Sequence, residues 1–597
     1  MNNKERVLLV HSYGPNELGW GEDMHDLMTS RLARAHGEFG LTSHCHHFAL
    51  YLIAENISNP TTVLENPHWD EFDRELNEGY DVVGFQLKTL HTAKVARMMK
   101  RIRQKRPKTK IVVGGYGVLP LGSQPLPGDV NGDAVYIREN ADYLCREEGV
   151  RFMRRILGDE PIDREITQYH LPMAGFTLEG LKTYARIPTI LVSLGCPNAC
   201  DFCVTSAMYR HKKISVAEPE QVYRFIKNYQ KRLGFKDIIV LLWDEDIFLN
   251  PDYVRELGRL LKSDRDTWGV RWFSFGSMRS LSQFEPGEIR ECGCKFVWIG
   301  VESFLCDQPS QDDPYYKRTG KDVEEMFENL SRQGVHIVGS LVLGFDFHTP
   351  DNLKEDIDRF VALKPLFYQV IPLTPCPGTE LYGRMLEEDR IYDTYKCEDG
   401  HAWKDDAFKI KNFERNEMRT YHDYAYERLR DLNGPPVLQF MEGELNAYQT
   451  FKKCADKYHT RLADESRRLA SASYAYLRSV KSHHPSEEVQ QRARMLARRY
   501  REEIGSPSLP IQAISHFNSR RIGKRSRDRP RDIVSDPPPR WTYYHTFGNK
   551  VLVRKGRKKK KPAPYREPGF LSFPRSRYFT EGLNYIRKGA RLASRFW

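Results

Sequence analysis

Residues 195–203 read GCPNACDFC and place Cys196, Cys200 and Cys203 within eight residues. They directly follow the apolar run TILVSL at 189–194, which has the length of a buried strand. Further strand-like runs alternate with helical segments. Six such strand–helix units predict a partial (β/α)6 barrel of the TIM type over residues 185–390, with chemistry at the carboxyl ends of its strands. The five later runs are 237–243, 270–275, 296–301, 336–343 and 367–373.

The three cysteines allow three interpretations. A zinc site usually takes four ligands in paired C-x2-C spacing, and no second pair at a convincing spacing follows in the sequence. Buried structural thiols would not need to cluster in one loop. An iron–sulfur cluster accepts thiolates from a short loop, and a four-iron cluster held by only three thiolates leaves one iron open to a non-protein ligand. The spacing therefore favours a 4Fe-4S cluster on these cysteines.

Residues 1–165 alternate strands with helices. The runs at 7–10, 81–85 and 110–115 are continuous and rich in β-branched residues, as expected of parallel strands covered on both faces. We expect a doubly wound, Rossmann-like α/β domain. Ligands of such domains lie beyond the carboxyl ends of the strands, which directs attention to the loops at 12–14, 86–89 and 114–117. The alternative for GGYG at 114–117 is a tight strand–helix turn.

The C-terminal third divides into two parts. Residues 405–503 are rich in Ala, Leu, Arg, Glu and Tyr and predict a helical domain that completes the core or covers the barrel mouth. Residues 506–597 hold 23 Lys and Arg against 5 Asp and Glu and predict a basic tail of low helical pattern. Its last stretch, 575–597, fits a basic amphipathic helix suited to an anionic membrane or an acidic partner. A solvated tail, or a helix docked on the protein itself, is the alternative.

Length and composition limit the classes of protein. At 597 residues the chain is too long for one core, and no run of about 18 uninterrupted apolar residues indicates a membrane span. The first apolar stretch is too short for a signal peptide, and 11 scattered cysteines do not form a disulfide framework. We expect a cytoplasmic protein, with a peripheral membrane contact if the terminal helix binds lipid.

The cysteine loop, with Phe202 before its last cysteine, resembles that of the radical SAM superfamily. This resemblance implies that S-adenosylmethionine chelates the open iron of the cluster. It further implies that Phe202 and Glu302, the latter in GVES at 300–303, position the nucleoside. Asp244, in the acidic segment WDEDIF at 243–248, is a weaker candidate for the cofactor site, and a structural ion pair is its alternative. Similar matches are the glycine-containing segment 338–344 and IPLTPCPGT at 371–379.

One branch of that superfamily carries an N-terminal cobalamin-binding domain, which residues 1–165 resemble. The resemblance rests on 81–85, 111–115 and 141–149, and it implies a corrin held by the three loops. His11 does not stand in the D-x-H-x-x-G context of a cobalt ligand, so we expect cobalamin without a histidine lower ligand. The expected cobalamin contacts are Ser12, Tyr13, Gly14, Gln86, Thr89, Gly114, Gly115 and Gly117.

The resemblance implies a cobalamin-dependent methyltransferase that acts on an unactivated carbon through a 5′-deoxyadenosyl radical. A small-molecule or lipid-like substrate and an external one-electron donor of the flavodoxin or ferredoxin type are the expected partners. A cyclase or rearrangement enzyme without methyl transfer is the first alternative. An RNA-modifying or RNA-binding protein ranks lower, because residues 1–185 hold only Cys45 and Cys145 where tRNA-thiomethylating relatives carry three further cysteines. No residue is singled out as catalytic.

Overall fold

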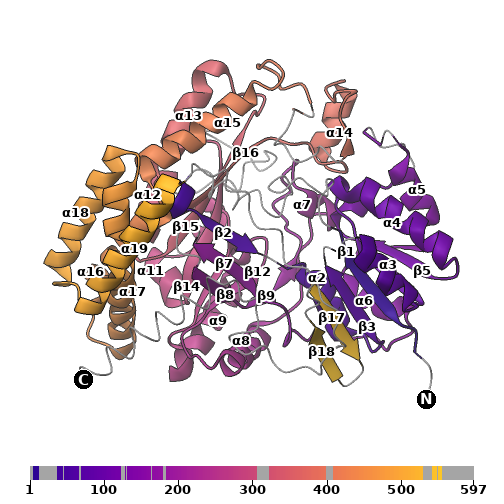
Figure 1. Cartoon of the computed structure of the whole chain (residues 1–597), viewed down its shortest axis with the longest axis horizontal. Coiled ribbons are helices and arrows are strands. Elements are labelled where there is room, and N and C mark those ends of the chain that lie inside the picture. The colour runs from indigo at the N-terminus through magenta and orange to yellow at the C-terminus, as the bar shows by residue number, and fades with distance from the viewer. Residues whose placement is uncertain are drawn as a thin grey trace.

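The computed structural model describes residues 4–12, 36–44, 46–65, 67, 69–122, 128–129, 131–162, 165–178, 183–305, 322–397, 406, 408–528, 541–546 and 549–553. A strand-and-helix domain formed mainly by the N-terminal part, a central sheet and a set of C-terminal helices follow one another across the molecule (Figure 1). Within these residues, no helix has both the length and the apolar character that crossing a bilayer requires.

The N-terminal domain is doubly wound, as predicted. Its parallel strands lie in the order β3-β1-β4-β5-β6. One face packs against α3 (Trp69–Asn77), α4 (Thr92–Lys105) and α5 (Asp133–Asn140), and the other packs against α2 (Phe48–Asn56) and α6 (Gly149–Ile156). The chain changes direction between β1 and β4, so the loops after these strands lie at the topological switch point. The strands are β1 (Val7–His11), β3 (Thr61–Glu65), β4 (Val82–Gln86), β5 (Lys110–Gly114) and β6 (Tyr143–Leu144).

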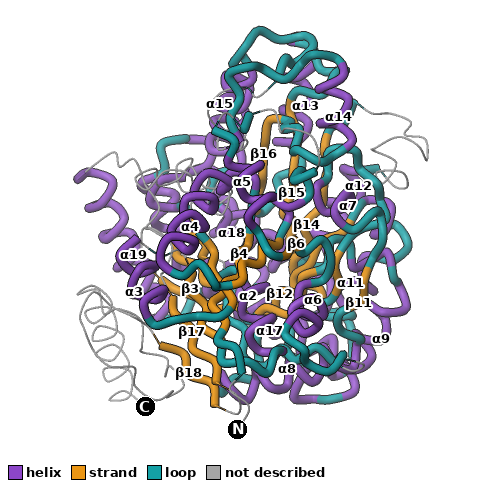
Figure 2. The backbone as a smooth tube through the Cα atoms, turned by 90° about the vertical axis from the view of Figure 1, so that its right-hand side faces the viewer, coloured by secondary structure: helices purple, strands orange, loops and turns teal. Residues whose placement is uncertain are grey.

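The C-terminal segment departs from the predicted tail. Helix α19 (Leu509–Asp528) continues the helical domain, so the expectation of low helical content after residue 506 is wrong for this stretch. A hairpin of β17 (Trp541–Thr546) and β18 (Asn549–Val553) adds to the N-terminal sheet, because β17 pairs antiparallel with β3. Both backbone views show this hairpin beside β3 (Figures 1 and 2). The expected terminal helix at 575–597 lies outside the described residues.

The central domain is the predicted incomplete barrel. Its six strands are parallel and neighbour one another in chain order, from β9 at one edge to β16 at the other. Apolar side chains of the outer face pack against the connecting helices, which include α8 (Pro219–Leu233), α9 (Pro251–Ser263), α12 (Val323–Arg332) and α13 (Pro350–Ala362). The strands are β9 (Thr189–Leu191), β12 (Ile239–Trp243), β13 (Arg271–Gly276), β14 (Cys294–Glu302), β15 (His336–Leu343) and β16 (Phe367–Pro372).

A small antiparallel sheet that the sequence did not predict consists of β2 (Leu41–His44), β7 (Ala174–Leu178) and β8 (Thr183–Ile187). It joins a segment that precedes β3 to the segment that leads into the barrel. The chain therefore returns to its own N-terminal part before the barrel begins.

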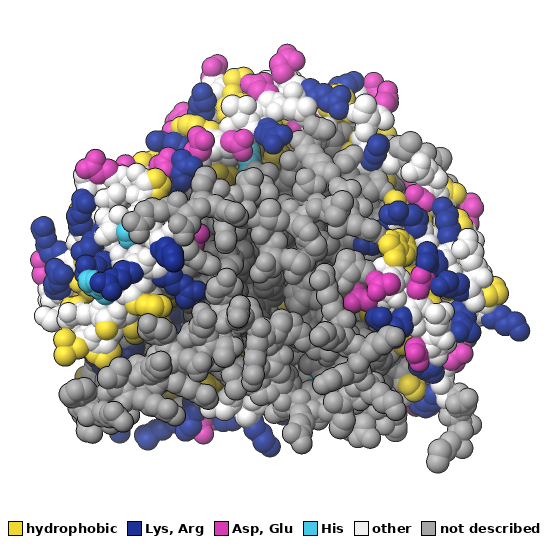
Figure 3. Space-filling model, in the orientation of Figure 1, with side chains coloured by type: hydrophobic (Ala, Val, Ile, Leu, Met, Phe, Trp, Pro, Cys, Tyr) yellow, Lys and Arg dark blue, Asp and Glu magenta, His cyan; other side chains and the backbone are white. Residues whose placement is uncertain are grey.

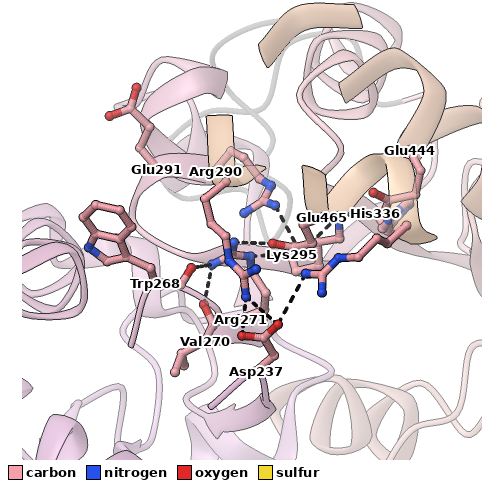
Figure 4. A network of polar contacts seen from close by, with 12 residues as sticks. Asp237, Trp268, Val270, Arg271, Arg290, Glu291, Lys295, His336, Glu444 and Glu465 are labelled. Atoms are coloured by element: carbon pink, nitrogen blue, oxygen red, sulfur yellow. Dashed lines mark hydrogen bonds and ion pairs between the residues drawn. The ribbon is translucent and has the colours of Figure 1, made fainter. Parts of the chain in front are cut away.

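The helical domain comprises α15 (Met418–Arg428), α16 (Pro436–Phe451), α17 (Lys457–His483), α18 (Glu487–Glu503) and α19. Met418, at the start of α15, packs against Gly344 beyond the carboxyl end of β15. Helices α16 and α17 contact the amino ends of the barrel strands. Buried ion pairs make this contact (Figure 4): Arg271 pairs with Glu465, and the Lys295 Nζ lies 2.6 Å from the Glu444 Oε1. These cations stand at the starts of β13 and β14.

Candidate functional site

The cysteine loop leaves the barrel sheet and forms its own small hairpin. The predicted strand 189–194 breaks after Leu191, and β10 (Ser193–Leu194) pairs instead with β11 (Ile214–Ser215). Gly195 follows with a φ of +79°, and a Cβ there would lie 2.1 Å from the Lys212 carbonyl oxygen. Only glycine fits this close approach. The loop is thereby folded back into a tight turn at the carboxyl end of β9.

The three thiols lie together within this loop. Cys196 and Cys200 are 8% and 6% exposed, and Cys203 is partly exposed where α7 (Val204–Met208) begins. Burial raises the pKa of Cys196 to about 12, and the charges of Asp246, Cys200 and Cys203 add to this effect. Thiolates in such surroundings are stabilised by the positive charge of a bound metal group. The donor set therefore fits a cluster.

The described residues contain no group of three His, Cys, Asp or Glu side chains placed to hold a single metal ion. In a four-iron cluster each thiolate is bound to its own iron, so three ligands need not share one point. The arrangement of Cys196, Cys200 and Cys203 is compatible with that kind of group.

The acidic segment after β12 holds the cysteine loop. The Ser193 hydroxyl donates a hydrogen bond of 2.7 Å to one carboxylate oxygen of Asp244, and the Lys213 Nζ lies 2.8 Å from the other. The Asn198 amide donates to Asp246 over 3.2 Å. Both acids are buried. The geometry thus favours the ion-pair alternative for Asp244 over the predicted cofactor contact, because both of its oxygens already have partners.

Glu245, between these two acids, was not among the predicted site residues. Glu245 is exposed at the surface, yet desolvation by the surrounding protein and the charge of Asp244 raise the pKa of its carboxyl to about 7. Glu245 also lies near enough to influence the hydroxyls of Tyr116 and Tyr209 electrostatically. Tyr116 belongs to the N-terminal domain and Tyr209 to the cysteine loop. A titratable carboxyl therefore stands where the two domains meet.

The segment after β16 closes the open side of the sheet. Burial raises the pKa of Cys376 to about 11, and the nearby Cys203 contributes. In α14 (Glu380–Glu387), the Leu381 amide donates to the Asp201 carbonyl over 3.0 Å, and Arg384 pairs with the Asp201 carboxylate at 2.6 Å. Since β9 and β16 are the two edge strands, these contacts link the beginning and the end of the partial barrel around the cysteines.

Phe202 and Glu302, the predicted nucleoside contacts, lie at neighbouring places in the site. The Phe202 ring packs 6.2 Å from that of Phe345, which follows the end of β15. Glu302 ends β14, is 6% exposed and has a φ of +60° beside an irregularity in the β14–β15 register. Such backbone strain in a residue other than glycine gathers at functional positions. This observation agrees with a binding role for Glu302.

A buried triad that the sequence did not reveal fixes the strand ends behind Glu302. The Ser303 hydroxyl donates to the Asp356 carboxylate over 2.8 Å, and the His348 Nδ1 accepts the Gly344 amide over 2.9 Å. The His348 Nε2 lies 3.3 Å from Asp356. All three side chains are fully buried, so they position the ends of β14 and β15. No sequence pattern indicates this triad, because its residues come from three separate segments.

Two predicted cobalamin contacts carry polar atoms suited to a ligand. The Ser12 hydroxyl and the Gln86 side-chain oxygen are buried, and among the described residues neither has a hydrogen-bond partner. They follow β1 and end β4, on either side of the switch point. Buried polar atoms normally have partners, so these two fit a bound polar group. Thr89 is partly exposed nearby, whereas Tyr13 and Gly14 lie outside the described residues.

The glycines at 114–117 form the tight turn that was the alternative to a ligand-binding loop. A Cβ on Gly115, whose φ is +92°, would lie 2.8 Å from the Leu87 carbonyl oxygen, and one on Gly117 would lie 2.6 Å from the Leu87 side chain. A Cβ on Gly114 would meet Cys145 at 3.2 Å. Packing within the domain accounts for these glycines, and their contact with cobalamin stays a prediction.

That turn also brings the two domains together. Met208 of α7 is buried in the apolar core of the N-terminal domain, and the Tyr116 ring packs against the same core. Burial raises the Tyr116 pKa. His11, at the end of β1, is fully buried and stacks on His47 with ring centroids 3.1 Å apart. The carboxyl edge of the N-terminal sheet thus lies next to the helix that follows the cysteines.

Half-buried aromatic rings line the inner face of the barrel sheet. Phe275 stacks between Trp243 and Trp298, with centroid distances of 5.9 and 5.2 Å. Phe48 from α2 stacks on Trp243 at 5.3 Å, so the row begins in the N-terminal domain. All four rings are partly exposed. Toward the amino end, Phe440 of the helical domain stacks on His336 at 4.4 Å. The row forms a flat apolar wall.

Residues 190–360 match the model of the radical SAM superfamily. These residues of the chain form a radical SAM domain. The matched radical SAM domain begins in β9 and ends in α13, so it includes the cysteine loop, the acidic segment and Glu302. The N-terminal and helical domains lie outside it.

Two curated relatives of this radical SAM protein come from Chlorobaculum tepidum. A bacteriochlorophyllide d C-12(1)-methyltransferase is 29% identical over 37% of this chain and 47% of its own length. A bacteriochlorophyllide d C-8(2)-methyltransferase is 25% identical over 60% of this chain and 81% of its own length. The match therefore spans about half of the first relative.

Among solved structures, the radical S-adenosylmethionine methyltransferase TsrM from Kitasatospora setae, with tryptophan substrate and a SAM analogue, superposes with a TM-score of 0.45. Its identity to this chain is 14%, and the alignment covers 78% of this chain and all of that one.

Proposed function

We propose that this radical SAM protein is a methyltransferase that moves a methyl group from cobalamin to a carbon atom of its substrate. The observation that carries the proposal is the burial of Met208 of α7 in the apolar core of the N-terminal domain, which places the carboxyl edge of the N-terminal sheet next to the cysteine loop. A methyl donor held at that edge would stand opposite the place where a radical is generated. The methyltransferase names of the two curated relatives support the same reaction.

When bound, the cluster, S-adenosylmethionine and cobalamin would supply an electron, a 5′-deoxyadenosyl radical and the methyl group. The residues of the chain would bind and orient these groups. Cys196, Cys200 and Cys203 would hold the cluster, with reduction by an external flavodoxin or ferredoxin.

Contacts around the cofactors would be divided between the domains. Phe202 and Glu302 would flank the nucleoside, while Ser12 and Gln86 would donate and accept hydrogen bonds at the corrin edge. No histidine is assigned to the cobalt, because His11 is buried in its stack with His47. Asp244 would act indirectly by fixing the cysteine loop through Lys213.

The aromatic wall supports a planar, apolar substrate. Trp243, Phe275 and Trp298 form a row of stacked, partly exposed rings, and a conjugated ring system would gain aromatic contact as well as apolar burial against them. The curated relatives are named for bacteriochlorophyllides, which are substrates of that shape. We therefore propose a substrate with an extended flat ring system.

Binding of a metal-free porphyrin, followed by quenching of tryptophan fluorescence, tests the substrate class. Trp298→Leu should weaken binding about three- to tenfold, since one aromatic pair is worth about 0.5–1.5 kcal/mol beyond area burial. Trp268→Leu, in the turn that precedes β13, serves as the control. A linear fatty acid that binds as well as the porphyrin would contradict a planar site while leaving the methyl-transfer proposal intact.

Product counting tests the reaction. The full chain, reconstituted with iron, sulfide and hydroxocobalamin, would receive S-adenosylmethionine labelled in its methyl group, a reductant and an extract of its own cells. We expect labelled methyl on a product, with S-adenosylhomocysteine and 5′-deoxyadenosine formed in similar amounts. Deoxyadenosine and product without S-adenosylhomocysteine would contradict methyl transfer and favour a cyclase or rearrangement.

A further inference from the structure

Helix α19 (Leu509–Asp528) turns polar side chains toward the protein. Ser515, Asn518 and Ser519, spaced at three and four residues, are buried to 5%, 4% and 7% exposure. Asn518 donates a hydrogen bond of 3.2 Å to the Ala475 carbonyl, and the Ser519 hydroxyl lies 3.1 Å from the His483 Nε2. These contacts fix which face of the helix packs on α17. Ile522 is the one large apolar residue among the described side chains of α19 that is fully buried.

The opposite face of α19 is apolar and exposed. Leu509, Ile514 and Phe517 are 79%, 50% and 44% exposed, and Met495 on α18 is 63% exposed. Together they make up half of the eight large hydrophobic side chains that are strongly exposed in the described part of the chain. A surface helix normally turns its apolar face to the core. This reversed orientation gathers exposed apolar side chains at one place, which marks an interaction surface.

Cations surround these apolar side chains. Arg520 and Lys524 continue the exposed side of α19, and the sequence from 506 to 527 contains no Asp or Glu. Figure 3 shows dark blue and yellow side chains next to one another over α18 and α19. Further cations on α17 and α18, for which the described residues supply no carboxylate partner within ion-pair distance, are Arg478, Lys481, Arg494, Arg498 and Arg501.

Three of these arginines lie near Lys481. Burial, together with the charges of Arg478, Arg501 and Arg494, lowers the pKa of Lys481. Like charges therefore lie close together here, although separation would lower the electrostatic energy. An anionic partner would relieve this repulsion.

We propose that the α17–α19 surface, defined by Leu509, Ile514, Phe517, Met495 and the surrounding Lys and Arg side chains, docks on an anionic lipid bilayer. The apolar side chains would enter the boundary between headgroups and acyl chains, and the cations would contact lipid phosphates. A nucleic acid would use the cations but would leave the apolar stripe of α19 in water. A protein partner would need acidic groups around an apolar groove, and it is an outcome of the test below.

Vesicle flotation of the full chain tests the surface. Vesicles of phosphatidylglycerol mixed with phosphatidylcholine should float the protein, and vesicles of phosphatidylcholine alone should do so at least about tenfold less well. The triple variant Leu509→Ser, Ile514→Ser, Phe517→Ser should lose at least about tenfold in partitioning. The matched control, Phe235→Ser with Leu386→Ser, removes exposed apolar side chains elsewhere and should bind like the natural chain. Equal binding by both variants would overturn the proposal.

Depth-dependent quenching locates the contact, because the basic cluster at 554–561 could also attract vesicles. In vesicles with brominated acyl chains, Phe517→Trp should add a quenched fluorescence component, whereas Phe235→Trp should add an unquenched one. Bound protein without extra quenching in Phe517→Trp would overturn the proposal. So would a dimer of the natural chain that the triple serine variant converts to a monomer, since the face would then be a protein interface.

Discussion

Buried charged side chains have different roles at the two ends of the barrel sheet. At the amino end, Arg271, Arg290 and Lys295 meet Glu465 and Glu444 from the helical domain in a buried network of charged side chains (Figure 4). At the carboxyl end, Asp244 and Asp246 bind the cysteine loop and its hairpin, and Asp246 also accepts a hydrogen bond from Ser280 of α10 (Met278–Leu281). Chemistry in barrels of this kind occurs at the carboxyl ends of strands, whereas the amino ends serve stability.

Buried ion pairs thus join two domains at one end of the sheet and hold the cysteine loop at the other. The amino-end network fastens two domains, so its loss should lower the stability of the fold. The carboxyl-end pairs fasten the loop that carries Cys196, Cys200 and Cys203, so their loss should lower occupancy of the cluster. The following variants separate these two effects.

Cys200→Ala should have the largest effect. Removal of one thiolate leaves two cluster ligands, so we expect loss of the visible absorption of the cluster and of all deoxyadenosine formation. Cys454→Ala, which removes an exposed thiol in the helical domain, is the matched control and should retain both. Cleavage of S-adenosylmethionine by Cys200→Ala would contradict the assignment of the cluster.

Glu465→Gln should lower the free energy of unfolding by about 3–5 kcal/mol, because it leaves buried arginines without their counter-charge. Burial alone would raise the Glu465 pKa, yet the charges of Arg271, Arg290 and Lys295 hold it well below its ordinary value. The stabilisation is therefore present above the ordinary carboxyl pKa and is lost as the pH falls through the lowered one.

Thermal unfolding measures this difference, with Asp464→Asn as the exposed neighbour on the same helix. Cluster absorption per folded molecule should stay unchanged in Glu465→Gln. A variant that kept its stability but lost the cluster would reverse the roles assigned to the two ends.

Asp244→Asn should affect retention of the cluster more than the stability of the fold, which is the reverse of the effect expected for Glu465→Gln. It removes the counter-charge of Lys213, so we expect about 1–3 kcal/mol of local destabilisation and weaker retention of the cluster. Iron content after gel filtration measures the retention, and Asp252→Asn on the outer α9 is the control. Unchanged iron content with lost nucleoside binding would restore the sequence-based assignment of Asp244 as a cofactor contact.

Glu245→Gln should have the smallest effect. The raised carboxyl pKa of about 7 means that the folded protein holds a proton at pH values where the unfolded chain releases it. This contribution to stability is present below the ordinary carboxyl pKa and declines as the pH rises to about 7. The melting temperature of the natural chain should fall relative to that of Glu245→Gln between pH 5 and pH 7. A constant difference would contradict the raised pKa.

The sequence predicted what depends on local patterns. The six barrel strands, the doubly wound domain and the cysteine loop follow from apolar periodicity and close spacing. The hairpin 541–553 could not be predicted, because its partner β3 lies far away in the sequence. For the same reason the sequence did not reveal the triad of Ser303, His348 and Asp356.

At two places residue type alone did not show which groups lie close. Glycines in the turn at 114–117 indicate close approach, and the structure places Leu87 against Gly115 and Gly117. Their predicted contact with cobalamin stays a prediction. Asp244 stands in an acidic segment typical of a cofactor site, yet its oxygens are taken by Ser193 and Lys213. The contacts of a side chain are known only from the folded structure.

We expect the N-terminal sheet edge and the cysteine loop to form one site. Electron paramagnetic resonance of the protein loaded with cob(II)alamin and a reduced cluster measures whether they do. If the contact of α7 with the N-terminal domain joins the two edges, the spectrum should show magnetic interaction between cobalt and cluster. A spectrum equal to the sum of the two centres measured separately would contradict a shared site.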